Sequence, residues 1–260
     1  MSAPVLETRN LSIRFGGHVA VDGVSCAFRT GTLTAIVGPN GAGKTTYFNL
    51  MSGQLPASSG SVFLDGENIT HLGAAARTRR GIGRAFQITN LFPNLSVREN
   101  VRLAVQARSP RAANLWSRWT RHVEWINRAE QFLDEVDLAD KRHVVAAALP
   151  HGDKRKLEVA LMMALEPHVF MFDEPTAGMS IDEVPIILDL IKKLKAAGDR
   201  TILLVEHKMD VVRSLADRII VLHNGKLVAD GVPEEVIASP IVQQAYLGAA
   251  SAPFSAKDGS

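Results

Sequence analysis

A glycine-rich stretch at residues 38–45 constrains the fold of this chain more than any other feature. It reads GPNGAGKT and matches the pattern G-x-x-x-x-G-K-[ST] at every fixed position. An apolar run at residues 33–37 predicts a buried strand before it, and residues 45–51 predict a helix after it. This order predicts a phosphate-binding loop, because glycines let successive N–H groups turn inward and the helix adds its positive N-terminal end.

Residue types inside the loop predict how a nucleoside triphosphate and its Mg²⁺ ion are held. Lys44 is expected to reach the β- and γ-phosphates, and the Thr45 hydroxyl is expected to bind Mg²⁺. The rest of the cradle is formed by Gly38, Asn40, Gly41, Gly43 and Thr46. The alternative is a glycine-rich turn without a ligand, which the flanking strand and helix make less favourable.

Composition excludes several classes of protein. With 46% apolar residues, 22% charged residues and a net charge of +2, the 260-residue chain is neither disordered nor a strongly basic nucleic-acid binder. Cys26 is the only cysteine, so no disulfide forms within the chain. No apolar run approaches the roughly 18 residues of a membrane span, and residues 1–10 lack the apolar core of a secretory signal. A membrane role therefore requires a partner.

The order of the predicted elements indicates an α/β protein. Short β-like runs at residues 6–15, 18–21 and 24–28 predict an antiparallel sheet ahead of the loop. Helical periodicity dominates residues 96–165. Strands and helices are predicted on either side of this block, at residues 60–64, 71–79, 169–172, 182–197, 201–205, 208–215 and 218–222. Such alternation predicts a mainly parallel sheet with helices on its faces.

Two carboxylates follow a second apolar run and complete a site for phosphoryl transfer. Residues 169–172 predict a buried strand, and Asp173 and Glu174 stand at its C-terminal end, where open α/β sheets bind ligands. Asp173 is expected to act on Mg²⁺, directly or through water, and Glu174 to polarise the attacking water as general base. The alternative is an acidic turn before Pro175, which the preceding phosphate-binding loop disfavours.

In order and over nearly the whole chain, these motifs resemble the nucleotide-binding subunits of ABC transporters. Besides the loop and the acidic pair, the likeness rests on Phe15, Gln87, residues 149–153, residues 177–180 and His207. It implies a P-loop NTPase (RecA-like) core with an N-terminal antiparallel β-subdomain and a helical subdomain inserted at about residues 88–165. The domain would span residues 1–248, followed by a flexible tail at 249–260. Two such domains would sandwich two ATP molecules, hydrolyse them and drive a membrane partner.

The resemblance implies a role for each of the added residues. Phe15 would stack on adenine, Gln87 would bind Mg²⁺ and serve catalysis, and His207 would hydrogen-bond the γ-phosphate. Gly152 would contact the ATP held by the partner domain. Each also has a plain structural alternative: a core aromatic for Phe15, a turn residue for Gln87 and a helix N-terminal residue for His207.

A narrower resemblance connects the chain with the ATPases of branched-chain amino-acid importers. It is similar to the component of that group with the longer helical insert, on the segments GRAFQ, RKLEVA, DEPTAGM, EHKMD and AYLG. Relatives of this kind also move urea, amides and other small polar solutes, so the transported solute stays open.

This resemblance implies partners and a location. The partners would be membrane permease subunits, a second ATP-binding subunit of the same or a companion chain and, indirectly, a solute-binding protein. The chain would sit at the cytoplasmic face of the inner or plasma membrane. Three alternatives stay open: an ABC ATPase outside transport, an exporter-type ATPase and a nucleotide-binding regulator without turnover.

The segment LPHGD at residues 149–153 departs from the family signature LSGGQ. Pro150 replaces the serine, His151 the first glycine and Asp153 the glutamine. Proline offers neither a cap nor a hydroxyl, and an aspartate adds negative charge near a phosphate. We hypothesise a weak contact in trans and asymmetric pairing with a companion ATPase; the alternative is that proline is ordinary at this position in the branched-chain group. Combining Pro150→Ser with Asp153→Gln is then expected to raise ATP turnover of the isolated chain, measured as phosphate release, and an unchanged or lower rate would contradict the hypothesis.

All three tryptophans lie with several arginines between Arg108 and Ile126. Trp116, Trp119, Val123 and Ile126 fall on one helical stripe, which favours a packed helix. A docking surface for the permease, a lipid surface and a nucleic-acid surface remain alternatives.

Overall fold

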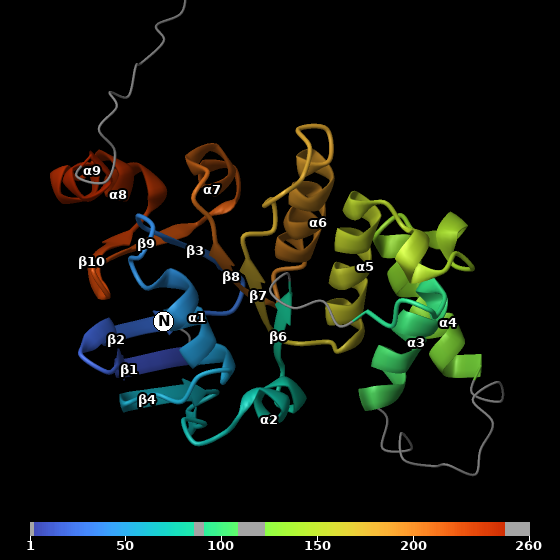
Figure 1. Ribbon diagram of the computed structural model, residues 1–260, viewed down its shortest axis with the longest axis horizontal. Helices are drawn as coiled ribbons and strands as arrows, with labels where there is room; N and C mark the ends of the chain where they lie inside the picture. The colour runs from blue at the N-terminus through green and yellow to red at the C-terminus, as the bar shows by residue number, and fades with distance from the viewer. Residues whose placement is uncertain (1–2, 86–90, 109–122, 248–260) are drawn as a thin grey trace, which may run out of the picture.

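The computed structural model describes residues 3–85, 91–108 and 123–247, in which two β-sheets carry helices on their faces (Figure 1). A four-stranded antiparallel sheet has the order β2-β1-β4-β5 and a six-stranded sheet the order β10-β9-β3-β8-β7-β6. The predicted α/β class is therefore confirmed. The tail predicted at residues 249–260 lies outside the described residues.

The antiparallel sheet is formed by β1 (Leu6–Phe15), β2 (His18–Phe28), β4 (Ser59–Leu64) and β5 (Glu67–Asn68). The sequence predicted two strands at residues 18–21 and 24–28, but β2 is continuous. The break expected at Asp22-Gly23 is absorbed by register shifts between β1 and β2 on either side of Leu11. Bulges of this kind insert an unpaired residue and keep the strand intact, so the turn prediction was wrong.

The six-stranded sheet is almost wholly parallel. Its strands are β3 (Leu33–Val37), β6 (Ile82–Ala85), β7 (Val169–Asp173), β8 (Thr201–Val205), β9 (Arg218–His223) and β10 (Lys226–Gly231), of which only β10 runs antiparallel, to β9. Every residue of β3, β7 and β8 is buried. Strands covered on both faces need apolar side chains on both, which explains their continuous rather than alternating hydrophobic pattern.

Helix α1 (Lys44–Ser52) fills the space between the two sheets (Figure 1). Its Tyr47 and Phe48 are fully buried in one cluster with residues of both sheets, among them Leu11 of β1 and Ile36 of β3. On the other face of the six-stranded sheet, Phe172 and Val37 belong to two further clusters. That other face is covered by α5 (His151–Ala164), α6 (Val184–Ala196) and α7 (Met209–Leu215). The start of α1 is thereby fixed at the edge where the strands end.

A helical block of α3 (Val97–Arg108), α4 (Val123–Glu135) and α5 stands beside the sheets (Figure 1). Trp125 of α4 is buried, whereas Val123 is 55% exposed, so the predicted stripe is wrong at Val123. That stripe would have turned Val123 inward, but the buried face of α4 runs through Trp125, Ala129, Phe132 and Leu133. Trp116 and Trp119 lie outside the described residues.

Several elements have weak sequence patterns and were not predicted. They are β6, β10, α8 (Pro233–Ala238) and α9 (Pro240–Leu247). The helix predicted at residues 71–79 is shorter in the structure, where α2 spans Ala74–Arg79. Among the described residues, no helix combines the length and the apolar character that crossing a bilayer requires.

Candidate active site

The glycine-rich loop adopts the backbone conformation that its glycines predict. Gly38, Gly41 and Gly43 have φ values of 150°, 79° and 96°, in the region that side chains disfavour. A Cβ atom would lie 2.1 Å from the Leu222 carbonyl oxygen at Gly38 and 2.3 Å from that of Ala20 at Gly43. The loop is therefore wedged between β9 and β2, and no larger residue fits at either position.

Lys44 begins α1 with its ammonium group directed back into the loop. Its Nζ donates hydrogen bonds to the Gly38 and Pro39 carbonyl oxygens, at 2.7 and 3.0 Å. Burial lowers the pKa of Lys44, and the nearby carboxylates of Glu174 and Asp173 oppose that shift. A cation held over the loop in this way is positioned to meet phosphate oxygens.

A hollow of about 390 Å³ opens over the loop. It is lined by Phe15, His18, Ala20, Asn40, Gly41, Ala42, Gly43, Lys44, Thr45, Thr46 and Glu174. Phe15 is 49% exposed, as a residue that stacks on a base must be, and not a core aromatic. His18 pairs with Phe15 across the β1–β2 hairpin. This histidine was not predicted, although the hairpin spacing places it opposite Phe15.

Asp173 ends β7 with a carboxylate that is almost fully buried. Its Oδ2 accepts a hydrogen bond from Nη2 of Arg84 at 2.7 Å, and the two side chains are 6% and 7% exposed. Burial raises the pKa of Asp173, and the Arg84 guanidinium opposes that shift. Arg84 was not predicted as a site residue, although an arginine within a short apolar run before Gln87 is itself unusual.

Glu174 follows Asp173 in a conformation that L-residues rarely adopt. Its φ is 50°, and its N–H donates to the Val205 carbonyl oxygen at 2.9 Å. Left-handed backbone at a non-glycine residue costs on the order of 1–3 kcal/mol, and such residues cluster at functional sites. The turn places the partly exposed Glu174 side chain on the hollow above the loop.

His207 stands next to Glu174 at the end of β8. Its Nδ1 lies 3.9 Å from Oε1 of Glu174 and 3.6 Å from Oε2 of Glu206. Glu206 is fully buried, and its Oε2 accepts hydrogen bonds from the backbone N–H groups of His207 and Lys208, at 2.8 and 3.4 Å. Thr176 donates its hydroxyl to Oε1 of the same carboxylate. Glu206 thus ties the His207 loop to the segment after Glu174, a function that sequence reasoning missed.

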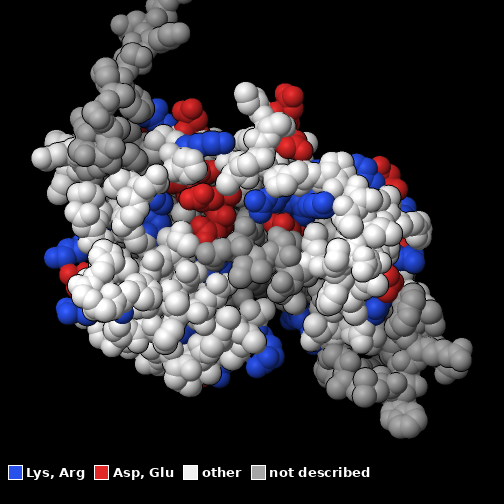
Figure 2. Space-filling model, in the orientation of Figure 1, with Lys and Arg blue, Asp and Glu red and all other residues white. Residues whose placement is uncertain are grey.

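The donor set at this edge fits Mg²⁺ and a nucleoside triphosphate. Thr45 and Asp173 offer oxygen atoms, the ligands that Mg²⁺ prefers. Figure 2 shows acidic side chains in the central hollow of this face, with basic side chains beside them. The glycine cradle and Lys44 complement phosphate charge. Gln87, predicted as a metal ligand and catalytic group, lies outside the described residues.

The signature segment begins α5, with Pro150 in the capping position and no side-chain cap. The N–H of Gly152 donates to Oε1 of Glu183 at 3.0 Å, and the other oxygen of Glu183 accepts from the N–H of Ser180 at 3.1 Å. Asp153 is paired with Lys141, with 2.6 Å between Oδ2 and Nζ. The negative charge of Asp153 is therefore partly neutralised, and the N-terminus of α5 already holds a carboxylate.

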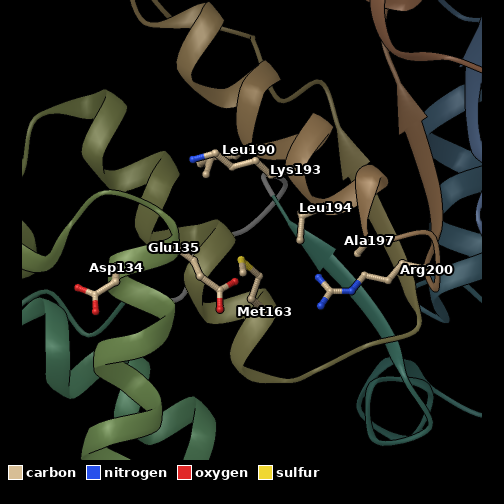
Figure 3. Close-up of a pocket in the computed structure, with 8 residues that line it drawn as sticks. All are labelled: Asp134, Glu135, Met163, Leu190, Lys193, Leu194, Ala197 and Arg200. Carbon is tan, nitrogen blue, oxygen red and sulfur yellow. The ribbon is translucent and has the colours of Figure 1, made fainter.

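A second hollow, of about 350 Å³, separates the helical block from α6 (Figure 3). It is lined by Asp134, Glu135, Met163, Leu190, Lys193, Leu194, Ala197 and Arg200. Glu135 and Arg200 reach into it from opposite walls. It contains none of the residues predicted to bind nucleotide, so the hollow over the loop remains the candidate site.

Comparison with known proteins places this geometry among ATP-binding subunits. Residues 21–177 match the family model described as ABC transporter, and residues 226–252 match the model described as branched-chain amino acid ATP-binding cassette transporter. The chain is 38% identical over 256 residues to the high-affinity branched-chain amino acid transport ATP-binding protein BraF of Pseudomonas aeruginosa, covering 96% of this chain and 100% of that protein.

Two further comparisons agree. The chain is 35% identical over 257 residues to the high-affinity branched-chain amino acid transport ATP-binding protein LivG of Escherichia coli K12, covering 96% of this chain and 100% of that protein. Among solved structures, the ADP conformation of an ATP-binding cassette of an ABC transporter aligns with a TM-score of 0.83 at 30% identity, covering 95% of this chain and 100% of that one.

Proposed function

The chain belongs to the family of ABC transporter ATP-binding proteins, and on that premise we propose that it powers the import of branched-chain or other small amino acids. The position of Glu174 is the main support for ATP hydrolysis. Its carboxylate lines the same hollow as Lys44, Thr45 and Thr46 and supplies the base that hydrolysis needs. The solute class follows from the names of BraF and LivG and from the match at residues 226–252.

The residues divide the work of hydrolysis as follows. Phe15 stacks on adenine, and the loop amides with Lys44 hold the phosphates. Thr45 and Asp173, with Gln87, would hold Mg²⁺, which would supply positive charge where the phosphoryl oxygens gain negative charge. Glu174 takes a proton from the attacking water, and the new P–O bond forms as the bond to the leaving ADP oxygen breaks. His207 donates a hydrogen bond to the γ-phosphate, and Glu206 fixes its loop.

The proposed transport function also requires the chain to assemble with membrane subunits and with a second ATP-binding subunit. The chain would bind permease subunits from the cytoplasmic face of the inner or plasma membrane and pair with a second ATP-binding subunit. Gly152 would then contact the ATP of that second subunit. Because Pro150 provides no hydroxyl at this contact, we propose a companion chain with the usual signature rather than a symmetric pair. A solute-binding protein would act on the permease from the other side.

Solute uptake tests the transport part. Permease subunits co-expressed and co-purified with the chain are reconstituted into vesicles loaded with Mg-ATP, and uptake of radiolabelled leucine is measured with a leucine-binding protein outside. We expect leucine uptake that stops when Glu174 is changed to Gln. Uptake of urea or an amide in place of leucine would change the assigned solute. Failure of the chain to co-purify with any permease subunit would favour an ABC ATPase outside transport.

A further inference from the structure

Arg84 is a charged residue inside a buried sheet. It belongs to β6 and pairs with Met171 of β7, and its side chain is only 7% exposed. Burying a guanidinium is costly unless its N–H groups and its charge are satisfied. The groups that the Arg84 guanidinium contacts therefore indicate why a charged residue is buried here.

The guanidinium joins three elements at one point. Nη2 donates to Oδ2 of Asp173 at 2.7 Å, whereas Nη1 donates to Oδ1 of Asn49 at 2.6 Å and to Oγ of Ser52 at 2.9 Å. Asn49 and Ser52 lie on α1, the helix that begins with Lys44 and Thr45. The guanidinium carbon also lies 5.4 Å from the centre of the Phe48 ring. Arg84 thus fixes Asp173 relative to the helix that carries Thr45, another proposed metal ligand.

Only one oxygen of Asp173 is used in this arrangement. Among the described residues, the hydrogen bond that the Asp173 side chain accepts is the one from Arg84 to Oδ2, which leaves Oδ1 available for a cation or its water. Without this bond the carboxylate would be free to rotate about its Cβ–Cγ bond, and neither oxygen would keep a fixed position. One fixed oxygen and one available oxygen are what a pre-formed metal ligand needs.

We propose that Arg84 is a positioning residue for the metal site: it holds Oδ2 of Asp173 so that Oδ1 stays free for the cation that Thr45 would also hold. The inference rests on the proposed ATPase function. Outer-shell partners of ligating carboxylates act in this way in other metal sites, and their loss costs about 10- to 100-fold in metal affinity or activity.

Arg77 supplies a matched control. Its side chain is also buried, and it donates to the carbonyl oxygens of Leu50 and Met51 at the end of α1, at 2.7 and 2.8 Å. Its other bonds go to the carbonyl oxygens of Thr70 and Leu72. Arg77 therefore braces the same helix without touching a carboxylate. Changing Arg77 to Met removes a buried guanidinium and lowers stability without changing the metal site.

Metal-dependent nucleotide binding distinguishes positioning from bracing. The affinity of the full chain for the non-hydrolysable ATP analogue AMP-PNP is measured by calorimetry, once with Mn²⁺ and once with EDTA. We expect Arg84→Met to reduce the gain in affinity that Mn²⁺ provides by about 10-fold or more, and to leave the affinity in EDTA unchanged. Arg77→Met should keep the full gain while lowering the melting temperature. Arg84→Gln, which retains hydrogen-bonding groups, serves if the methionine variant does not fold.

Two results would overturn the inference. An unchanged Mn²⁺ gain in Arg84→Met and Arg84→Gln would make Arg84 a structural brace like Arg77. A larger gain would mean that Arg84 competes with the cation for Asp173. A parent chain that does not bind AMP-PNP, or shows no Mn²⁺ gain, would instead contradict the proposed ATPase site itself.

Discussion

Changing Glu174 to Gln is expected to lower the rate of ATP hydrolysis by about 100- to 10,000-fold while ATP still binds. The amide has nearly the size of the carboxylate but cannot take a proton from water. The backbone at Glu174, with φ of 50° and its N–H bonded to Val205, does not depend on the side-chain charge. Phosphate release under Mg-ATP and binding of a fluorescent ATP analogue measure the two effects separately.

Asp182→Asn is the control for this change, since it removes one exposed acidic charge away from the hollow. It should hydrolyse ATP at the parent rate. If the Glu174→Gln chain retains more than about a tenth of the parent rate, a group other than Glu174 is the general base. Light scattering on the same variant with Mg-ATP also reports pairing: a dimer would favour a symmetric engine, and a monomer the companion subunit proposed above.

Replacing Lys44 with Ala is expected to weaken ATP binding by about 10- to 100-fold, because hydrogen bonds to charged groups contribute roughly 1.5–3 kcal/mol each. The loss should be larger for ATP than for ADP, since the γ-phosphate is one of the two groups that Lys44 is proposed to meet. Calorimetry with both nucleotides measures the difference.

Lys192→Ala removes an exposed lysine from α6 and should bind both nucleotides normally. The melting temperature of Lys44→Ala shows whether loss of the bonds to Gly38 and Pro39 has loosened the loop. Equal weakening for ATP and ADP would contradict contact between Lys44 and the γ-phosphate.

Local patterns made the core of the candidate site predictable. The loop is a run of adjacent residues, and the acidic pair can be recognised because it directly follows four apolar residues. Arg84 was beyond this reasoning because its partners Asn49 and Asp173 lie 35 and 89 residues away and meet it only in the folded sheet. The same limit applies to Glu206, whose bond to Thr176 joins two loops 30 residues apart.

Edge elements were missed for a different reason. β10 is an edge strand with β9 as its only neighbour in the described sheet, and its residues are mostly half-buried and lack the apolar run that identified β3, β7 and β8. For α4 the sequence correctly predicted a helix but assigned the wrong buried face at its start, because the first turn alone has too few residues to fix which face is buried. Val123 shows the error, with more than half of its surface in solvent.

The hydrogen bond from Gly152 to Glu183 places a carboxylate at the N-terminus of α5 within the single chain, before any pairing with a second subunit. A phosphate contributed by that subunit would have to displace the Glu183 carboxylate from the Gly152 N–H, because that N–H is already hydrogen-bonded. Swapping one anion for another yields less free energy than filling an empty site, which weakens attachment. In the proposed pairing, a subunit without nucleotide would offer no phosphate to replace Glu183, so the contact at the N-terminus of α5 would depend on bound nucleotide.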